Sequence, residues 1–333
     1  MYTDIPIILA IVFVVVGLFT LAWSADTFID GAASIAKALG INPFVVGMVV
    51  IGFGTSAPEL CVSALSGFSG HSDLSLGNAY GSDVFNIAAI LGVAALIRPI
   101  AVKPSIVYAA VPTLIAITLL SCLLVITGSG FSRMDGVIML VTFAVLLPMY
   151  CWFDGKDKPA EVTPHDANKS ESPSIPVAVA KLVGGLLLLV GSSHILVWGA
   201  VDLARALGVS ELMIGLTIVG IGTSLPELAS AIAAARRGQN EFVLGNIVGS
   251  NFFNTLAVVG LAGTISPFND ISKWVLWRDL PIILILSATI ALFGFNWRDR
   301  RLPGRINRIE GAIWTLFYLA YLGATILIET RTT

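Results

Sequence analysis

The chain has 333 residues, of which 56% are hydrophobic and 12% are charged, with a formal net charge of −2. A soluble domain carries about 25% charged residues, so this composition excludes a soluble globular protein and indicates an integral membrane protein. The near-neutral balance favours no charged partner, and we expect the lipid bilayer as surroundings, with no nucleic acid and no obligate protein partner. The three cysteines lack metal-ligand spacing and are read as buried apolar residues.

A membrane-spanning helix needs about 20 mostly apolar residues. By that rule the sequence predicts an all-α membrane protein with ten transmembrane helices. The first has neither the basic start nor the small-residue cleavage site of a signal peptide, so it is read as a span. The expected spans are 5–23, 42–67, 77–97, 105–127, 134–153, 176–200, 210–235, 243–264, 274–295 and 308–328. The polar stretch between the fifth and sixth spans, with three prolines, suits a flexible linker.

A polar octet interrupts the second predicted span. It reads Gly52-Phe-Gly-Thr-Ser-Ala-Pro-Glu59 and puts a glutamate at membrane depth, where an ionisable group is costly and by default marks an ion or substrate pathway. Pro58 has no backbone N–H, so the carbonyl of Gly54 loses its helical partner and must be satisfied by protein, water or a cation. Carboxylate, hydroxyl and backbone oxygens are the ligands that a hard cation prefers.

The octet occurs twice. It returns 168 residues later as Gly220-Ile-Gly-Thr-Ser-Leu-Pro-Glu227, where Pro226 should free the carbonyl of Gly222 in the same way. The segment 77–86 returns at the same offset as 245–254, and 15 of 35 positions are identical between 52–86 and 220–254. The chain is therefore an internal duplication, with a first five-helix repeat at 1–153, a linker at 154–175 and a second repeat at 176–333.

Five spans before the linker require the two repeats to enter the membrane from opposite sides. The basic residues agree with this inversion. The linker side carries fourteen of them and the other side five, which makes the linker cytoplasmic by the positive-inside rule and both termini external. We expect a plasma (inner) membrane location. Inverted repeats with broken helices and polar groups near the midplane are typical of secondary transporters.

The repeated motifs supply one set of oxygen ligands from each half. On a helix, Thr55 and Glu59 are four residues apart and project from one face, with Ser56 beside them. A packing role for these small residues does not explain a glutamate in each copy. Two carboxylates with neutral oxygens suit Ca²⁺ or more than one Na⁺, and ligands for softer metals are missing. The candidate side chains are Glu59, Glu227, Thr55, Thr223, Ser56, Ser224, Ser82, Ser250, Asn86 and Asn254.

The paired motifs GTSxPE and GNxxGSxxxN resemble the α-repeats of the calcium/cation antiporter superfamily, specifically its sodium/calcium exchangers. The resemblance covers both repeats closely and the ten-span arrangement more loosely. It implies that the second, third, seventh and eighth helices enclose sites used alternately by Na⁺ and Ca²⁺. It also implies that the ten side chains above are ligands, together with backbone carbonyls around Gly52 and Gly220. Some prokaryotic members carry an aspartate where this chain has Asn254, so the site here has two formal charges.

The resulting function is an antiporter that exchanges Na⁺ for Ca²⁺ by alternating access. A Ca²⁺/H⁺ antiporter of the same fold is the alternative, since Glu59 and Glu227 are able to carry protons. An intramembrane hydrolase lacks a histidine or lysine base in the motifs, and a channel has no need of inverted halves. We therefore expect no enzyme activity and no cofactor, only transported ions. Asp83, whose counterpart is Asn251, either lines the pathway or caps a helix or meets a nearby base.

Overall fold

The computed structural model describes residues 6–68, 72–127, 130–154, 174–209, 214–268, 271 and 274–332. Nearly all of them are helical, and several helices contain π-helical segments (η). The first half comprises α1 (Ile7–Leu39), α2 (Pro43–Val46), η1 (Gly47–Ile51), α3 (Gly52–Thr55), α4 (Ala57–Phe68), α5 (Ser72–Val84), η2 (Phe85–Leu91), α6 (Gly92–Ile97), η3 (Ile106–Ala110), α7 (Val111–Thr127) and α8 (Arg133–Asp154).

The second half repeats this order of elements. It comprises α9 (Ile175–Ala206), η4 (Ile214–Val219), α11 (Gly220–Gly222), α12 (Leu225–Arg236), α13 (Asn240–Phe252), η5 (Phe253–Val258), α14 (Val259–Ile265), η6 (Val275–Asp279), α15 (Leu280–Gly294) and α16 (Arg308–Thr332). The π-helical segments lie at matching places in the two halves. Such segments break the regular helical ladder and are frequent at functional sites.

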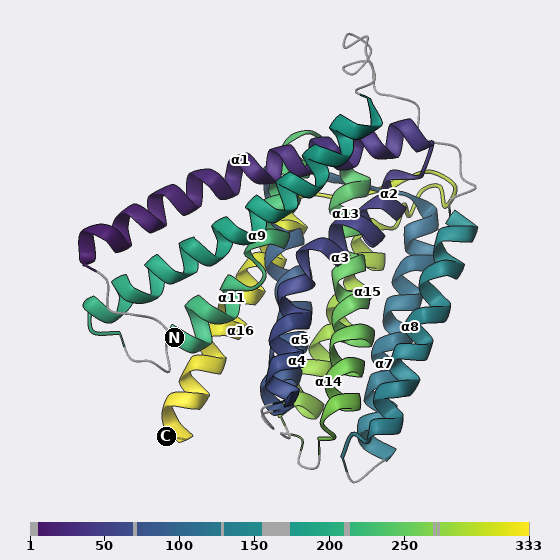
Figure 1. Ribbon diagram of the computed structural model, residues 1–333. Helices are drawn as coiled ribbons and strands as arrows, with labels where there is room; N and C mark the ends of the chain where they lie inside the picture. The colour runs from purple at the N-terminus through teal and green to yellow at the C-terminus, as the bar shows by residue number, and fades with distance from the viewer. Residues whose placement is uncertain are drawn as a thin grey trace.

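Two long helices, α1 and α9, lie side by side and cross the other helices obliquely (Figure 1). They have 33 and 32 residues and are each about 50 Å long, well above the ~30 Å hydrocarbon core of a bilayer, so they must tilt. Glycines allow their close approach. A Cβ on Gly185 would come within 2.7 Å of the Phe28 nitrogen, and one on Gly31 would overlap the backbone of Leu182.

The first predicted span, 5–23, was too short. The helix continues without a break to Leu39, past the polar residues Asp26 and Asp30. Both carboxylates form ion pairs with Arg237 at the end of α12. The helical pattern therefore extends beyond the apolar run from which the span was predicted.

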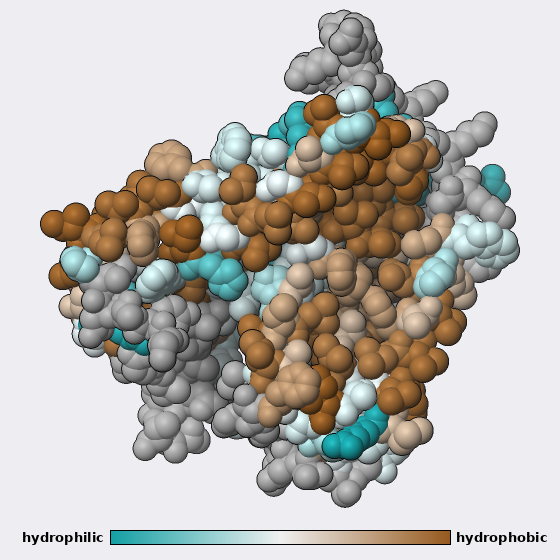
Figure 2. Space-filling model, viewed as in Figure 1, coloured by the Kyte–Doolittle hydropathy of each residue, from teal (hydrophilic) through white to brown (hydrophobic). Residues whose placement is uncertain are grey.

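Eight helices in the described part of the chain are long and apolar enough to cross a membrane, or nine if the bent pair Pro43–Thr55 and Ala57–Phe68 forms one span. The predicted span at 210–235 includes residues 210–213, which lie outside the described residues. The surface fits a bilayer. Large apolar side chains of α1, α8, α9 and α16 are exposed, and Figure 2 shows brown apolar surface over most of this face, with teal patches mainly toward its edges.

The halves interlock through their last helices. The last helix of the first half, α8, packs on α14 of the second half. The last helix of the second half, α16, packs on α6 of the first half. Glycines form both crossings. A Cβ on Gly136 would lie 2.7 Å from the carbonyl oxygen of Gly260, and one on Gly311 would lie 2.7 Å from that of Gly92. Gly92 and Gly260 occupy equivalent positions, 168 residues apart, so the same crossing is built twice.

The prediction of an all-helical chain needs one small correction. Two three-residue strands, β1 (Ile100–Val102) and β2 (Gly304–Ile306), pair antiparallel with Ile100 opposite Ile306. A single bridge between Phe131 and Phe268 likewise joins a residue of the first half to one of the second. These connecting segments satisfy their backbone groups by pairing with each other, which hydropathy alone does not predict.

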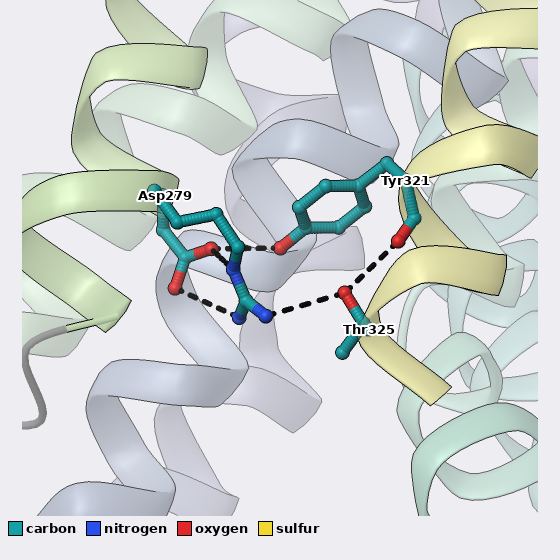
Figure 3. Close-up of polar contacts among 4 residues, drawn as sticks. Asp279, Tyr321 and Thr325 are labelled. Atoms are coloured by element: carbon teal, nitrogen blue, oxygen red, sulfur yellow. Dashed lines mark hydrogen bonds and ion pairs between the residues drawn. The ribbon is translucent and has the colours of Figure 1, made fainter. Parts of the chain in front are cut away.

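A polar cluster joins η6 to α16 (Figure 3). Arg278 Nε lies 2.7 Å from Asp279 Oδ1, and the Tyr321 hydroxyl donates to the same oxygen at 2.8 Å. Arg278 also donates to Thr325 Oγ1 at 3.3 Å. The Asp279 carboxylate thus has a cationic neighbour within the protein, and the cluster is explained as a structural tie between two helices.

Candidate functional site

Both octets break their helices, as the prolines predict. The helix ending at Thr55 and the one beginning at Ala57 differ in direction by 45°, with Ser56 between them at φ −83° and ψ 4°. In the second half Ser224 has φ −95° and ψ 11° and precedes α12. The freed carbonyl of Gly222 accepts a hydrogen bond from the Ser193 hydroxyl at 3.0 Å. The residue corresponding to Ser193 in α1 is Ala25, which has no hydroxyl to offer Gly54.

The two breaks bring the glutamates together with serines of the opposite repeat. Ser56 Oγ donates to Glu227 Oε1 at 3.1 Å, and Ser224 Oγ donates to Glu59 Oε1 at 3.3 Å. Both carboxylates are buried, with 0% and 1% of each residue exposed. The second oxygen of each, Oε2, has no hydrogen-bond partner among the described residues, and none of the ion pairs formed there includes either glutamate.

The threonines make a second pair of crossed contacts. Thr55 Oγ1 donates to Asn246 Oδ1 at 3.3 Å, and Thr223 Oγ1 donates to Asn78 Oδ1 at 3.5 Å. Asn246 also donates to the backbone oxygen of Glu227 at 3.2 Å. Asn78 and Asn246 were not predicted as site residues, although their identity in both copies of the second motif was a signal that could have identified them.

The remaining candidates come from α5 to η2 and from α13 to η5. Ser82 accepts a hydrogen bond from Ser224 or donates to it at 3.1 Å, whereas Ser250 Oγ is buried with no partner among the described residues. Asn86 and Asn254 lie in the π-helical segments, each almost fully buried, and the Oδ1 atom of each also has no partner there. Both repeats therefore bury oxygens without a described partner, and Ser82 is connected to Glu59 through Ser224.

The two glycine positions behave differently. The Gly52 carbonyl already accepts the Ser56 N–H at 3.0 Å, so it is engaged within its own helix. Gly52 also lets α13 approach, since a Cβ there would lie 3.0 Å from the Ser250 nitrogen. Gly220 begins α11 and is exposed. That the backbone carbonyls of Gly52 and Gly220 bind an ion stays a prediction.

The donor set defines which ions fit. Among the described residues, no group of three or more His, Cys, Asp or Glu side chains converges as a metal cluster would require. The two glutamates, the amides and the hydroxyls are hard oxygen donors, which bind Ca²⁺ and Na⁺ rather than soft transition metals. Two buried carboxylates that form no ion pair with the described residues also need compensation in a medium of low dielectric. A divalent ion, two monovalent ions or protonation can supply it.

Comparisons with known proteins identify the family to which this chain is related. The model of the sodium/calcium exchanger protein family matches residues 9–152 and 177–327. The protein CaxA of Alkalimonas amylolytica is 40% identical over 317 residues, covering 94% of this chain and 98% of CaxA. The inner membrane protein YrbG of Escherichia coli (strain K12) is 35% identical over 304 residues, covering 90% of this chain and 92% of YrbG.

A solved structure of a family member has the same fold as this chain. The sodium-calcium exchanger NCX_Mj superimposes with a TM-score of 0.82 at 28% sequence identity, over 96% of this chain and 99% of NCX_Mj. The fold and the match over nearly the whole chain therefore agree with the resemblance carried by the repeated motifs. The chain belongs to the sodium/calcium exchanger family of membrane antiporters.

Proposed function

We propose that the protein exchanges Na⁺ for Ca²⁺ across the plasma (inner) membrane through one central site shared by both ions. The observation that carries this proposal is the pair Glu59 and Glu227, buried together with one unpaired oxygen each and linked through serines of the opposite repeat. Two negative charges balance one Ca²⁺. The same charges balance two Na⁺, so occupation by one ion species excludes the other, as exchange requires.

The proposed ligands are the ten side chains of the repeated motifs. Glu59 and Glu227 supply the charge, and the threonine and serine hydroxyls and the amide oxygens of Asn86 and Asn254 complete the shell. Neutral oxygens from both halves let the coordination adjust between ions of different charge. Backbone carbonyls beside the two helix breaks are further candidates.

The unequal packing of the two halves supports alternating access. A Cβ on Gly249 would overlap the carbonyl of Met48, and one on Gly245 would come within 2.9 Å of Gly47, so α13 lies tightly against η1. The equivalent glycines Gly81 and Gly77 have no described atom within 4 Å of a Cβ. A transporter built from inverted repeats reaches its opposite-facing state by exchanging the two packings.

The test separates Na⁺ coupling from H⁺ coupling. Purified protein in Na⁺-loaded proteoliposomes should take up radioactive Ca²⁺ when diluted into Na⁺-free medium at equal pH inside and outside. An imposed pH gradient without a Na⁺ gradient should drive little uptake. Uptake that follows the pH gradient and ignores Na⁺ would replace this proposal with the Ca²⁺/H⁺ alternative.

A further inference from the structure

An asparagine outside the proposed ligand set, Asn246, connects the two helix breaks. It lies on α13 and is 1% exposed. Its Nδ2 atom donates to the backbone oxygen of Glu227 at 3.2 Å and to Ser230 Oγ at 3.1 Å, both in α12. Its Oδ1 atom lies 3.3 Å from the hydroxyl oxygen of Thr55, in the opposite repeat. Asn246 therefore contacts α12 of the second half and α3 of the first half at the same time.

The hydroxyl of Ser230 fixes the orientation of the Asn246 amide. Ser230 donates its only hydroxyl hydrogen to the Glu227 backbone oxygen at 2.9 Å. Ser230 Oγ is then an acceptor for Asn246, and the Glu227 carbonyl is an acceptor as well. A flipped amide would place its oxygen against two acceptors and lose both hydrogen bonds. The NH₂ group of Asn246 consequently faces α12, and its oxygen faces Thr55.

The oxygen of Asn246 is thus an acceptor beside a proposed ion ligand. Thr55 has one hydroxyl hydrogen, and two acceptors lie within its reach, Asn246 Oδ1 and the backbone oxygen of Ile51 at 3.0 Å. A hydroxyl that binds a cation does so through its oxygen lone pairs and must direct its hydrogen elsewhere. Both acceptors can take that hydrogen, which leaves the lone pairs of Thr55 available to an ion.

The equivalent residue of the first repeat, Asn78, is held differently. Thr223 Oγ1 donates to its Oδ1 atom at 3.5 Å, and its Nδ2 atom is buried with no partner among the described residues. Val62 stands where the second repeat has Ser230, so no hydroxyl is offered to the Asn78 amide from that position. The two asparagines occupy the same motif position, but the NH₂ group is tied to the neighbouring helix in the second repeat alone.

We propose that Asn246 is a positioning residue that holds Glu227 and Thr55 in register across the two repeats and thereby sets the affinity of the ion-binding centre. It acts on the backbone of Glu227, at the start of α12, and on the hydroxyl of Thr55. Its role therefore requires no contact of its own with the ion. The inference rests on the function proposed for the centre and adds a residue that orients its ligands.

The test compares Asn246→Ala with Asn78→Ala in Ca²⁺ exchange by proteoliposomes. Asn246→Ala should raise the Ca²⁺ concentration for half-maximal exchange by about tenfold or more, the usual effect of losing a group that orients a ligand, with a smaller change in maximal rate. Asn78→Ala is the matched variant at the equivalent position, and because its NH₂ group has no described partner it should shift this concentration by about threefold or less. Equal shifts in the two variants, or wild-type affinity in Asn246→Ala, would overturn the proposal.

A merely structural role for Asn246 predicts a lower unfolding temperature or maximal rate at unchanged Ca²⁺ affinity, and this result would overturn the proposal. Ser230→Ala is a second and milder test, which decides if Asn246→Ala does not fold. It removes one acceptor of the amide and should raise the half-maximal Ca²⁺ concentration by about threefold, the usual effect of one lost hydrogen bond. Wild-type affinity in Ser230→Ala would refute the fixed orientation and the proposal with it. Ser287→Ala removes another fully buried serine hydroxyl, on α15, and should leave the affinity unchanged.

Wild-type protein in the same assay separates this inference from the proposed function. If wild type exchanges Na⁺ for Ca²⁺ and Asn246→Ala keeps its affinity, only the role of Asn246 is wrong. If wild type does not exchange these ions, the proposed function fails, and thermal stabilisation by Na⁺, K⁺, Ca²⁺ and Mg²⁺ then decides on Asn246. For the cation that stabilises wild type most, the midpoint concentration should rise in Asn246→Ala and much less in Asn78→Ala. An unchanged midpoint, or no stabilisation by any of the four cations, would refute the role.

Discussion

Among single residues, the two glutamates provide the negative charge of the proposed site. They are the only carboxylates at equivalent motif positions, and each is bound by a serine from the opposite repeat. Each repeat alone would leave its glutamate without that serine. The charge needed for a divalent ion is therefore divided equally between the halves.

Glu59→Gln and Glu227→Gln should each abolish exchange. Either change leaves Ca²⁺ with one counter-charge in a site of low dielectric, and removing one partner of a buried charge pair costs about 3 kcal/mol or more, which corresponds to a loss in affinity of about a hundredfold or more. Ca²⁺ uptake into Na⁺-loaded proteoliposomes measures the effect. Because glutamine preserves the shape and accepts the serine hydrogen bond, both variants should purify as folded protein. Normal exchange by both folded variants would show that the centre lies elsewhere.

Sequence identified the polar residues of the repeated motifs better than it predicted the contacts among them. Repetition identified the glutamates, the hydroxyls and the amides. It did not reveal that Asn78 and Asn246 contact the threonines. The reason is physical. The helix Asn240–Ile265 is buried on all sides, so hydrophobic periodicity does not show which face meets which neighbour.

At the scale of elements, the prolines and glycines determine how the helices break and pack. The breaks at Ser56 and Ser224 were predictable, because Pro58 and Pro226 remove helical hydrogen bonds. The length of α1 was not, because the charged residues that ended the apolar run are paired with Arg237. Gly249 and Gly81 occupy equivalent positions but pack differently, so the same substitution should affect them differently.

Gly249→Ala should lower stability where Gly81→Ala does not. The added methyl group at 249 would overlap Met48 in η1, and overpacking of this kind costs about 1–3 kcal/mol. At the equivalent position 81 no described atom lies within 4 Å of the new Cβ, which makes it the matched control. Thermal unfolding in detergent measures both. Equal destabilisation of the two variants would contradict the unequal packing.

At the scale of the whole molecule, the duplication explains the interlocked architecture. The last helix of each half packs on the third helix of the other, through glycine pairs at equivalent positions. Sequence predicted the repeats and their inversion, and the structure describes eight to nine of the ten predicted spans. The packing of each last helix on the opposite half could not be predicted, since it depends on contacts between residues far apart in the chain.

The inversion itself makes a topological prediction. A reporter fused in the linker near Lys169 should read as cytoplasmic, and one fused after Thr333 should read as external, because fourteen of the nineteen basic residues fall on the linker side. Alkaline phosphatase and green fluorescent protein fusions give opposite signals on the two sides. The reverse pattern would invert the assigned orientation, and one shared side would exclude five spans after the linker.

In the proposed function, one site carries Na⁺ and Ca²⁺ in opposite directions. The most direct measurement loads proteoliposomes with radioactive Ca²⁺ at equal concentration on both sides and then imposes a Na⁺ gradient of either direction. We predict net Ca²⁺ entry when Na⁺ is higher inside and net Ca²⁺ exit when Na⁺ is higher outside, with both fluxes absent in Glu59→Gln. Ca²⁺ movement that does not change direction with the Na⁺ gradient would contradict the account.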